Sequence, residues 1–158
     1  NELAAVTNKT RLKGSLTDAI RRADVFIGLS TANIVSVEMV ASMAKKAIVF
    51  AMANPVPEIM PADAKKGGAA VVASGRSDFP NQINNSLAFP GVFRGALDCR
   101  AREVNEEMKL AAALAIANLV PKPTAESIVP SMFEKKLVPS VAKAVYDAAV
   151  ASGAAGKR

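Results

Sequence analysis

Residues 47–58 read AIVFAMANPVPE, a continuous apolar run followed at once by a polar stretch that contains two prolines. A short apolar run bounded by turn residues predicts a strand that is buried on both faces, as the strands of a parallel sheet are. Similar apolar runs at residues 25–29 and 69–73 predict one strand before it and one after it. Residues 25–73 are therefore predicted to contain a three-stranded sheet.

Helical spacing of apolar residues fills the segments between these strands. Ser36 is the predicted N-cap of a helix over residues 37–44, and residues 61–66 predict a second helix that ends at Gly67. Residues 15–23 predict a further short helix with a capping box before the first strand. Strands that alternate with crossover helices are typical of parallel βαβ units, so the predicted fold class is α/β.

The loops that follow the three strands are the predicted place for function. They comprise residues 30–33, 53–57 and 74–80. Because parallel strands all end at the same edge of a sheet, these loops are expected to lie together, and ligands of open parallel sheets bind at that edge.

The second half of the chain is predicted to be helical. Short helices are expected at residues 81–87 and 90–97, and a longer one at residues 104–119, which ends before Pro121. A proline-rich connection over residues 121–139 then leads to a last helix, whose apolar side chains include Val141 and Val145 and which Gly153 can end.

Composition excludes several classes of function. The 158 residues contain no histidine and one cysteine, so Ser-His and Cys-His catalysis and an internal disulfide are excluded within this chain. The formal charge of +6 is spread along the chain, and aromatic residues make up only 4%, which argues against a nucleic-acid partner. No apolar run reaches the length of a membrane span, so we expect a soluble, cytoplasmic protein with no membrane partner.

The end of the first strand offers Gly28 and Ser30. A glycine permits close approach of the backbone to a ligand, and the Ser30 hydroxyl can contact a sugar or a phosphate. An ordinary turn explains the same residues. A glycine-rich GxGxxG turn, the usual phosphate cradle of dinucleotide folds, is absent.

Asn54 lies directly after the central strand and is followed by Pro55 and Pro57, which restrict the backbone around it. Its amide has a donor and an acceptor, so it can bind a carboxamide, a ribose hydroxyl or a carboxylate without adding charge. The alternative is an Asx turn that only stabilises the loop.

Residues 74–85 hold the densest set of polar side chains in the chain: Arg76, Asp78 and four amides, Asn81, Gln82, Asn84 and Asn85. If Pro80 begins a helix, the amides of residues 81–85 lie at its positive end, which suits a carboxylate substrate. The alternative is that Arg76 pairs with Asp78 and that the amides cap the helix. No catalytic residue and no metal-binding cluster is apparent at the predicted edge.

Three long motifs carry a resemblance to a known family. Residues 53–59 read ANPVPEI, residues 75–85 read GRSDFPNQINN and residues 89–98 read FPGVFRGALD. In this order they resemble the malic enzymes, particularly the compact bacterial type. The resemblance extends from about residue 16 to residue 153.

The resemblance implies a fold, a reaction and a set of contacts. It implies that residues 1–120 are the back half of a Rossmann-like NAD(P)-binding domain and that residues 121–158 form a proline-rich connection and a C-terminal helix. Malic enzymes oxidise L-malate with NAD or NADP and decarboxylate the product to pyruvate, with Mg²⁺ or Mn²⁺ as the metal. The family's cofactor contacts correspond to Gly28, Ser30 and Asn54, and its substrate contacts to Asn54, Asn84 and Asn85.

The family's catalytic residues and metal ligands precede the region present here, so this sequence is assigned neither. We therefore expect a fragment of a homo-oligomeric oxidoreductase whose partner is the upstream part of the same enzyme. The alternative is a catalytically inactive nucleotide-binding or regulatory module of the same fold. A protein that binds nucleic acid through its positive charge is a third alternative, ranked last.

Overall fold

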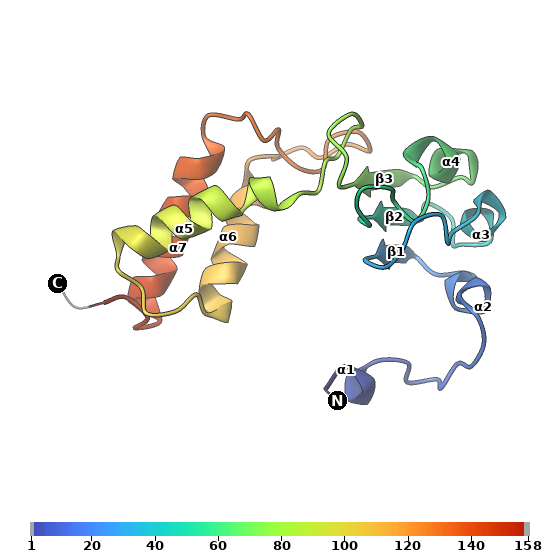
Figure 1. The fold of residues 1–158 in the computed structure, drawn as a ribbon, viewed down its shortest axis with the longest axis horizontal. Coiled ribbons are helices and arrows are strands. Elements are labelled where there is room, and N and C mark those ends of the chain that lie inside the picture. The colour runs from blue at the N-terminus through green and yellow to red at the C-terminus, as the bar shows by residue number, and fades with distance from the viewer. Residues whose placement is uncertain (1, 157–158) are drawn as a thin grey trace. The chain divides into compact units, whose positions relative to one another are not determined.

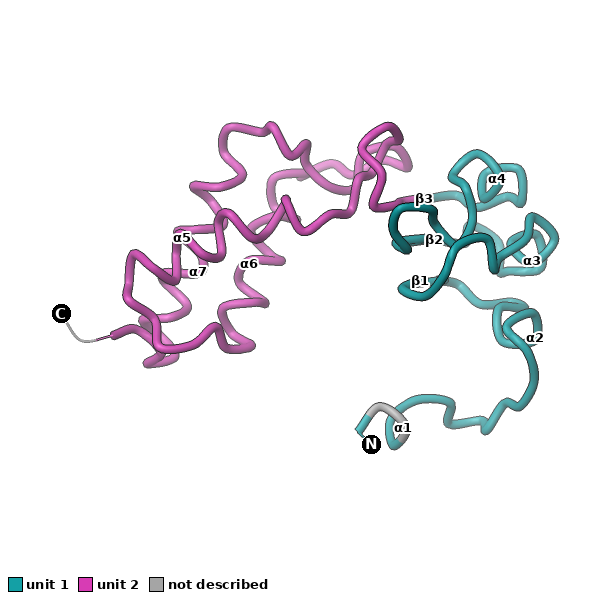
Figure 2. The backbone as a smooth tube through the Cα atoms, in the orientation of Figure 1, with its two compact units in different colours: residues 1–72 teal, residues 73–158 magenta. Residues whose placement is uncertain are grey.

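A computed structural model describes residues 2–156 of the chain (Figure 1). The chain divides into two compact units, Asn1–Val72 and Ala73–Arg158, which are described one at a time (Figure 2). The predicted domain boundary at residue 120 concerns the family's functional domains and stays a prediction.

Unit 1 alternates helices and strands in the predicted order. It contains α1 (Glu2–Val6), α2 (Leu16–Ile20), β1 (Val25–Gly28), α3 (Val37–Ala41), β2 (Ile48–Ala51) and α4 (Pro61–Lys66). The strand β3 (Val71–Ser74) begins in unit 1 and ends in unit 2.

The strands form one sheet with the order β1-β2-β3. β1 and β2 are parallel, with Val25 opposite Ile48 and Gly28 opposite Ala51. Parallel neighbours require crossover connections, and α3 lies on the connection between them (Figure 1). The prediction of an α/β fold with a Rossmann-like parallel sheet is confirmed.

The predicted helix caps of unit 1 are also present. Ser15 and Asp18 form a complete capping box at the start of α2. The Ser36 hydroxyl accepts a hydrogen bond from the Met39 N–H at 3.2 Å, which caps α3. Each cap satisfies an N–H group that has no partner inside its helix, and this explains why these short helices begin where the sequence predicts.

The core of unit 1 lies between the sheet and its helices and is built from small and branched aliphatic side chains. Its buried members are Ile20, Val35, Val40, Met43, Ala47, Val49, Ala51, Ile59, Ala64 and Val72. Val49 and Ala51 of the central strand are completely buried, which places β2 at the centre of this core.

Unit 2 is helical after β3, as predicted. Its elements are the 3₁₀-helix η1 (Asn85–Leu87) and the α-helices α5 (Phe89–Asp98), α6 (Glu106–Asn118) and α7 (Leu137–Ala151). A second core joins the three α-helices, and its completely buried side chains are Met108, Leu137, Val141, Val145 and Ala149.

Two glycines let α5 and α7 pack closely. A Cβ atom at Gly91 would lie 2.5 Å from Cβ of Val141, and one at Gly95 would lie 2.9 Å from Cβ of Val145. Real side chains do not approach so closely, so any larger residue here would push the helices apart.

The opposite face of α5 is apolar and exposed. Phe89, Phe93 and Leu97 follow one another at helical spacing with exposed fractions of 50%, 58% and 74%. The rings of Phe89 and Phe93 contact each other with centroids 5.7 Å apart. Three large exposed apolar side chains in a row form a surface patch that another protein segment can cover.

The largest differences from the predicted helices lie in unit 2. The helix predicted at residues 81–87 is wrong, because only residues 85–87 are helical and Asn81 has a positive φ of 57°, outside the helical region. α7 begins at Leu137 rather than after Pro139. Pro139 fits the first turn because its missing N–H would have no partner inside the helix.

Within residues 2–156 no helix combines the length and the apolar character that crossing a bilayer requires.

Candidate functional site

The ends of β1 and β2 form the predicted edge. Gly28 lies opposite Ala51 in the parallel register, so the loops that begin at Leu29 and Met52 leave the sheet on the same side. Ser30 and Asn54 lie in these two loops and both are exposed. Unit 1 thus brings Gly28, Ser30 and Asn54 to one edge of the sheet.

Beneath the two loops lies a carboxylate to which sequence analysis assigned no role. Glu58 has an exposed fraction of 0%. Its Oε1 accepts a hydrogen bond from the Ser30 N–H at 2.8 Å, and its Oε2 accepts one from the Ala53 N–H at 3.0 Å. We call these two hydrogen bonds the Glu58 bridge. In the part of the chain that the structure describes, no lysine or arginine forms an ion pair with this carboxylate.

The same carboxylate leaves room for no residue larger than glycine at position 28. A Cβ atom at this position would lie 2.6 Å from Oε1 and 2.8 Å from Oε2 of Glu58. The side-chain carboxyl group therefore occupies the space that any other residue at position 28 would need. This gives Gly28 a structural role, and its predicted cofactor contact stays a prediction.

The Asn54 amide is available to a ligand. Asn54 is exposed, and the Asn54–Pro55 peptide bond is cis. Among residues 2–156 the Asn54 side chain has no hydrogen-bond partner, so the alternative of an Asx turn at this position is wrong. An unpaired amide at the edge of the sheet can still donate and accept.

In unit 2, the charged groups of residues 74–85 pair with each other. The guanidinium of Arg76 donates from Nε to Oδ1 of Asp78 at 2.9 Å and from Nη2 to Oδ2 at 2.7 Å. These hydrogen bonds lower the pKa of Asp78 and raise the pKa of Arg76. The Arg76 guanidinium also lies 5.6 Å from the centre of the Phe79 ring. For these two residues the alternative of local pairing is confirmed.

Two of the four amides have structural roles. Asn81 is buried, and its side chain donates to the Ala125 carbonyl at 2.7 Å and accepts from the Ile128 N–H at 2.9 Å. Asn84 accepts from the Ser86 N–H at 3.0 Å through Oδ1, and thereby caps η1. Because residues 81–84 are not helical, the positive helix end predicted for a carboxylate is absent from residues 81–84.

Asn84 and Asn85 are both exposed on unit 2. The Nδ2 of Asn84 lies 3.5 Å from the Gly75 carbonyl oxygen, which is a long hydrogen bond. Asn54 belongs to unit 1 and the paired asparagines belong to unit 2. Their predicted meeting at one substrate site stays a prediction.

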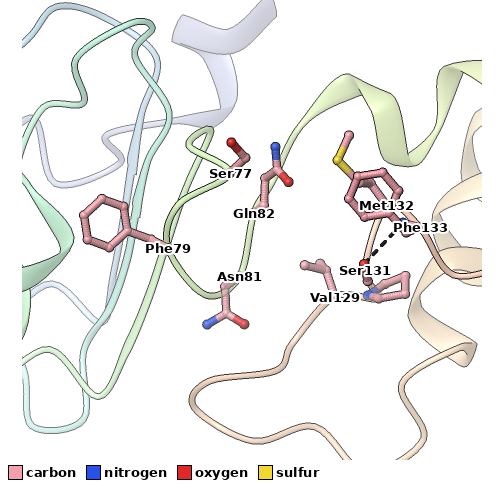
Figure 3. Close-up of a pocket in the computed structure, with 9 residues that line it drawn as sticks. Ser77, Phe79, Asn81, Gln82, Val129, Ser131, Met132 and Phe133 are labelled. Atoms are coloured by element: carbon pink, nitrogen blue, oxygen red, sulfur yellow. Dashed lines mark hydrogen bonds between the residues drawn. The ribbon is translucent and has the colours of Figure 1, made fainter.

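Unit 2 also contains a hollow of about 550 Å³ between the loop at residues 77–82 and the segment at residues 129–133 (Figure 3). Figure 3 shows Ser77 and Gln82 on one side of it and Met132 and Phe133 on the other. The Ser131 hydroxyl is already used, since it accepts a hydrogen bond from the Phe133 N–H at 3.2 Å. Of the predicted ligand-binding amides, Asn81 and Gln82 line this hollow, whereas Asn54, Asn84 and Asn85 do not.

The described residues offer no metal site of their own. Among the described residues 2–156, no group of three or more aspartate, glutamate, cysteine or histidine side chains could hold a metal ion. The single cysteine, Cys99, is free and buried. The residues present therefore do not form a metal centre by themselves.

Comparison with known proteins gives one family. Residues 2–150 match the family described as "Malic enzyme, NAD binding domain". The chain is 59% identical over 157 residues to the bifunctional malic/malolactic enzyme of Bacillus subtilis, covering 98% of this chain and 38% of that protein. It is 58% identical over 158 residues to the NAD-dependent malic enzyme of Geobacillus stearothermophilus, covering 99% of this chain and 33% of that protein.

Solved structures agree with this comparison. The crystal structure of malic enzyme from Pyrococcus horikoshii superposes with a TM-score of 0.90 at 45% identity, covering 96% of this chain and 35% of that chain. The chain thus spans 33–38% of the length of these three relatives.

Proposed function

Because the chain belongs to the malic enzyme NAD-binding domain family, we propose that it forms the cofactor-binding part of an enzyme that oxidatively decarboxylates L-malate to pyruvate. The observation that carries this proposal is the edge of β1 and β2, where Ser30 and Asn54 are exposed above the buried Glu58. Exposed polar side chains at the carboxyl end of a parallel sheet are the usual place where such folds bind a nucleotide.

The side chains at this edge fit NAD or NADP. Ser30 offers a hydroxyl and Asn54 offers an unpaired amide, and both are neutral groups that can donate and accept. They suit the sugar hydroxyls and the carboxamide of a nicotinamide dinucleotide. When bound, that dinucleotide accepts the hydride of the oxidised substrate, and Gly28, Ser30 and Asn54 orient it.

For the substrate, we infer that Asn54, Asn84 and Asn85 donate hydrogen bonds to the carboxylates of malate. All three are exposed, and amides bind carboxylates without adding charge near the nicotinamide ring. The local charges support this assignment, because Arg76 is already paired with Asp78 and the remaining side-chain donors of residues 76–85 are neutral.

The metal and the reacting groups belong elsewhere in this proposal. The described residues do not fit Mg²⁺ or Mn²⁺, since they form no acidic cluster. We assign the metal ligands and the proton-transferring residues to a longer protein that contains this sequence.

The exposed row Phe89, Phe93 and Leu97 supports a larger, homo-oligomeric enzyme that covers it. The free, buried thiol of Cys99 suits the reducing cytoplasm, and neither a membrane nor a nucleic acid is proposed as a partner.

The proposal is tested by measuring NADH or NADPH formation from L-malate in the presence of Mn²⁺. The longer enzyme should turn over, and the 158-residue chain alone should not. Turnover by the chain alone would contradict the assignment of the reacting groups elsewhere. A longer protein that binds the dinucleotide without turnover would favour the alternative of an inactive nucleotide-binding or regulatory module.

A substitution tests the site residues. Asn54→Ala in the longer enzyme should weaken malate or dinucleotide binding about tenfold or more, because it removes hydrogen bonds at the reacting end of both. Asn118→Ala, at an exposed asparagine of α6, is the matched control and should leave both affinities unchanged. Equal effects of the two substitutions would contradict the role of Asn54.

A further inference from the structure

The Glu58 bridge joins the two points at which the chain leaves the sheet. Ser30 lies two residues after the last residue of β1, and Ala53 lies two residues after the last residue of β2. Both backbone N–H groups point at one carboxylate, at 2.8 Å and 3.0 Å. The carboxylate of one side chain therefore holds both the backbone of Ser30 and that of Ala53, the neighbour of Asn54.

Main-chain hydrogen bonds lie on both sides of the bridge. At the end of the sheet the Met52 N–H donates to the Gly28 carbonyl at 3.1 Å, and two more hydrogen bonds lie farther along the chain. The Asn33 N–H donates to the Pro57 carbonyl at 3.1 Å, and the Val35 N–H donates to the Glu58 carbonyl at 3.0 Å. These main-chain contacts need no particular side chain at position 58. Only the carboxylate reaches Ser30, so the side chain acts where the ligand-facing residues lie.

The chemistry of the bridge requires a carboxylate. The two N–H donors meet different oxygens of Glu58, and in glutamine one of these two positions would be an NH2 group, which cannot accept a hydrogen bond. Burying a charge without an ion pair is costly, and hydrogen bonds from the backbone offset part of that cost. Such a group is difficult to explain as ordinary core packing, which an apolar residue would provide better.

We propose that Glu58 is a positioning residue that, through the Ser30 and Ala53 amides, holds Ser30 and Asn54 at the spacing that the dinucleotide requires. This inference rests on the proposed function, because it assumes that these two residues contact the cofactor. Gly28 belongs to the same arrangement, since only glycine leaves room for the carboxylate.

The first test is backbone amide hydrogen exchange on the 158-residue chain. Glu58→Gln puts an NH2 group in place of one of the two acceptor oxygens, so the amide of Ser30 or Ala53 should exchange about tenfold faster. The amide of Val49 in the central strand reports whether unit 1 stays folded and should not change. Glu103→Gln, at an exposed glutamate of unit 2, is the matched control. Unchanged exchange at both bridge amides would overturn the proposal.

Gly28→Ala provides a second variant that keeps the charge of position 58. The added methyl group would collide with the carboxyl group and displace it from the two amides. We expect faster exchange at the Ser30 and Ala53 amides again. Exchange at the wild-type rate in this variant would overturn the proposal, because it would show that the amides do not depend on where the carboxylate lies.

The second test separates positioning from simple loss of stability. In the longer enzyme, the dinucleotide dissociation constant is measured for Glu58→Gln, for Ser30→Ala combined with Asn54→Ala, and for the variant with all three substitutions. If Glu58 acts through Ser30 and Asn54, the triple variant should bind no more than about threefold more weakly than the variant that lacks only those two side chains. Effects that multiply fully would overturn the positioning role while the proposed function stands. A wild-type enzyme that binds neither NAD nor NADP would overturn both.

Discussion

The loop after β2 and the segment after β3 have similar compositions, yet their polar groups are used differently. In residues 53–58 the charged side chain is buried and bonded to backbone N–H groups, while Asn54 remains exposed and unpaired. In residues 75–85 the charged side chains pair with each other at the surface, and the amide of Asn81 is the buried group.

This difference shows how a polar stretch divides into structural and available groups. One polar side chain is buried in each stretch, Glu58 in the first and Asn81 in the second. Both satisfy backbone groups that would otherwise be buried without partners. The exposed asparagines, Asn54, Asn84 and Asn85, are the groups that a ligand can use.

The largest expected effect is that of removing the buried carboxylate. Glu58→Ala leaves the Ser30 and Ala53 N–H groups without an acceptor and opens a cavity, so the free energy of unfolding should fall by about 2–4 kcal/mol. Urea denaturation measures it, with Glu103→Ala as the exposed control. A loss below about 0.5 kcal/mol would mean that water replaces the carboxylate freely.

A smaller effect is expected in the segment after β3. Asn81→Ala removes the bonds to Ala125 and Ile128, and the free energy of unfolding should fall by about 1–3 kcal/mol. Asn81→Gly loses the same bonds but fits the positive φ, so it should be less destabilising than alanine. If the two variants are equally stable, the positive φ of this residue carries no cost.

The paired asparagines should differ from each other. Asn84→Ala removes the cap of η1 and should cost about 0.5–1 kcal/mol, whereas Asn85→Ala should leave stability unchanged. In the longer enzyme both substitutions should weaken malate binding. Thermal unfolding and substrate affinity, measured on the same two variants, separate capping from ligand contact.

The smallest effect concerns the exposed pair of Arg76 and Asp78. Hydrogen bonding to Arg76 lowers the pKa of Asp78 below its ordinary value of 3.8, so the folded state favours the ionised carboxyl group. The resulting stabilisation is complete well above pH 3.8 and is lost as the pH falls through the lowered pKa. Unfolding measured between pH 2 and pH 5 should show a slightly weaker pH dependence in Asp78→Asn. An identical pH profile would mean that the pair contributes nothing to stability.

The sequence predicted those features whose partners are near in the chain. The caps at Ser15 and Ser36 lie within three residues of the N–H groups that they satisfy, so composition and spacing reveal them. The bonds of Glu58 to Ser30 and of Asn81 to Ile128 span 28 and 47 positions, and their partners are backbone groups that any residue possesses.

One signal could have revealed Glu58. It lies between Pro57 and Ile59, in a stretch that continues directly from a buried strand, and a charged residue there needs a specific partner. The helix predicted at residues 81–87 was wrong because Asn81 has a positive φ and its side chain bonds to the distant Ala125 carbonyl, so the chain does not continue as a local helix. Long-range bonds of this kind override local propensity.

Because Cys99 is buried, its reaction with a thiol reagent reports whether the surrounding helices are folded. Its Sγ lies at the end of α5, donates to the Gly95 carbonyl at 3.2 Å and is the chain's only thiol. An alkylating agent can reach this thiol only when the helices of unit 2 separate, whereas opening of unit 1 exposes no thiol. The rate at which Cys99 is alkylated therefore measures local unfolding of unit 2 and does not respond to local unfolding of unit 1.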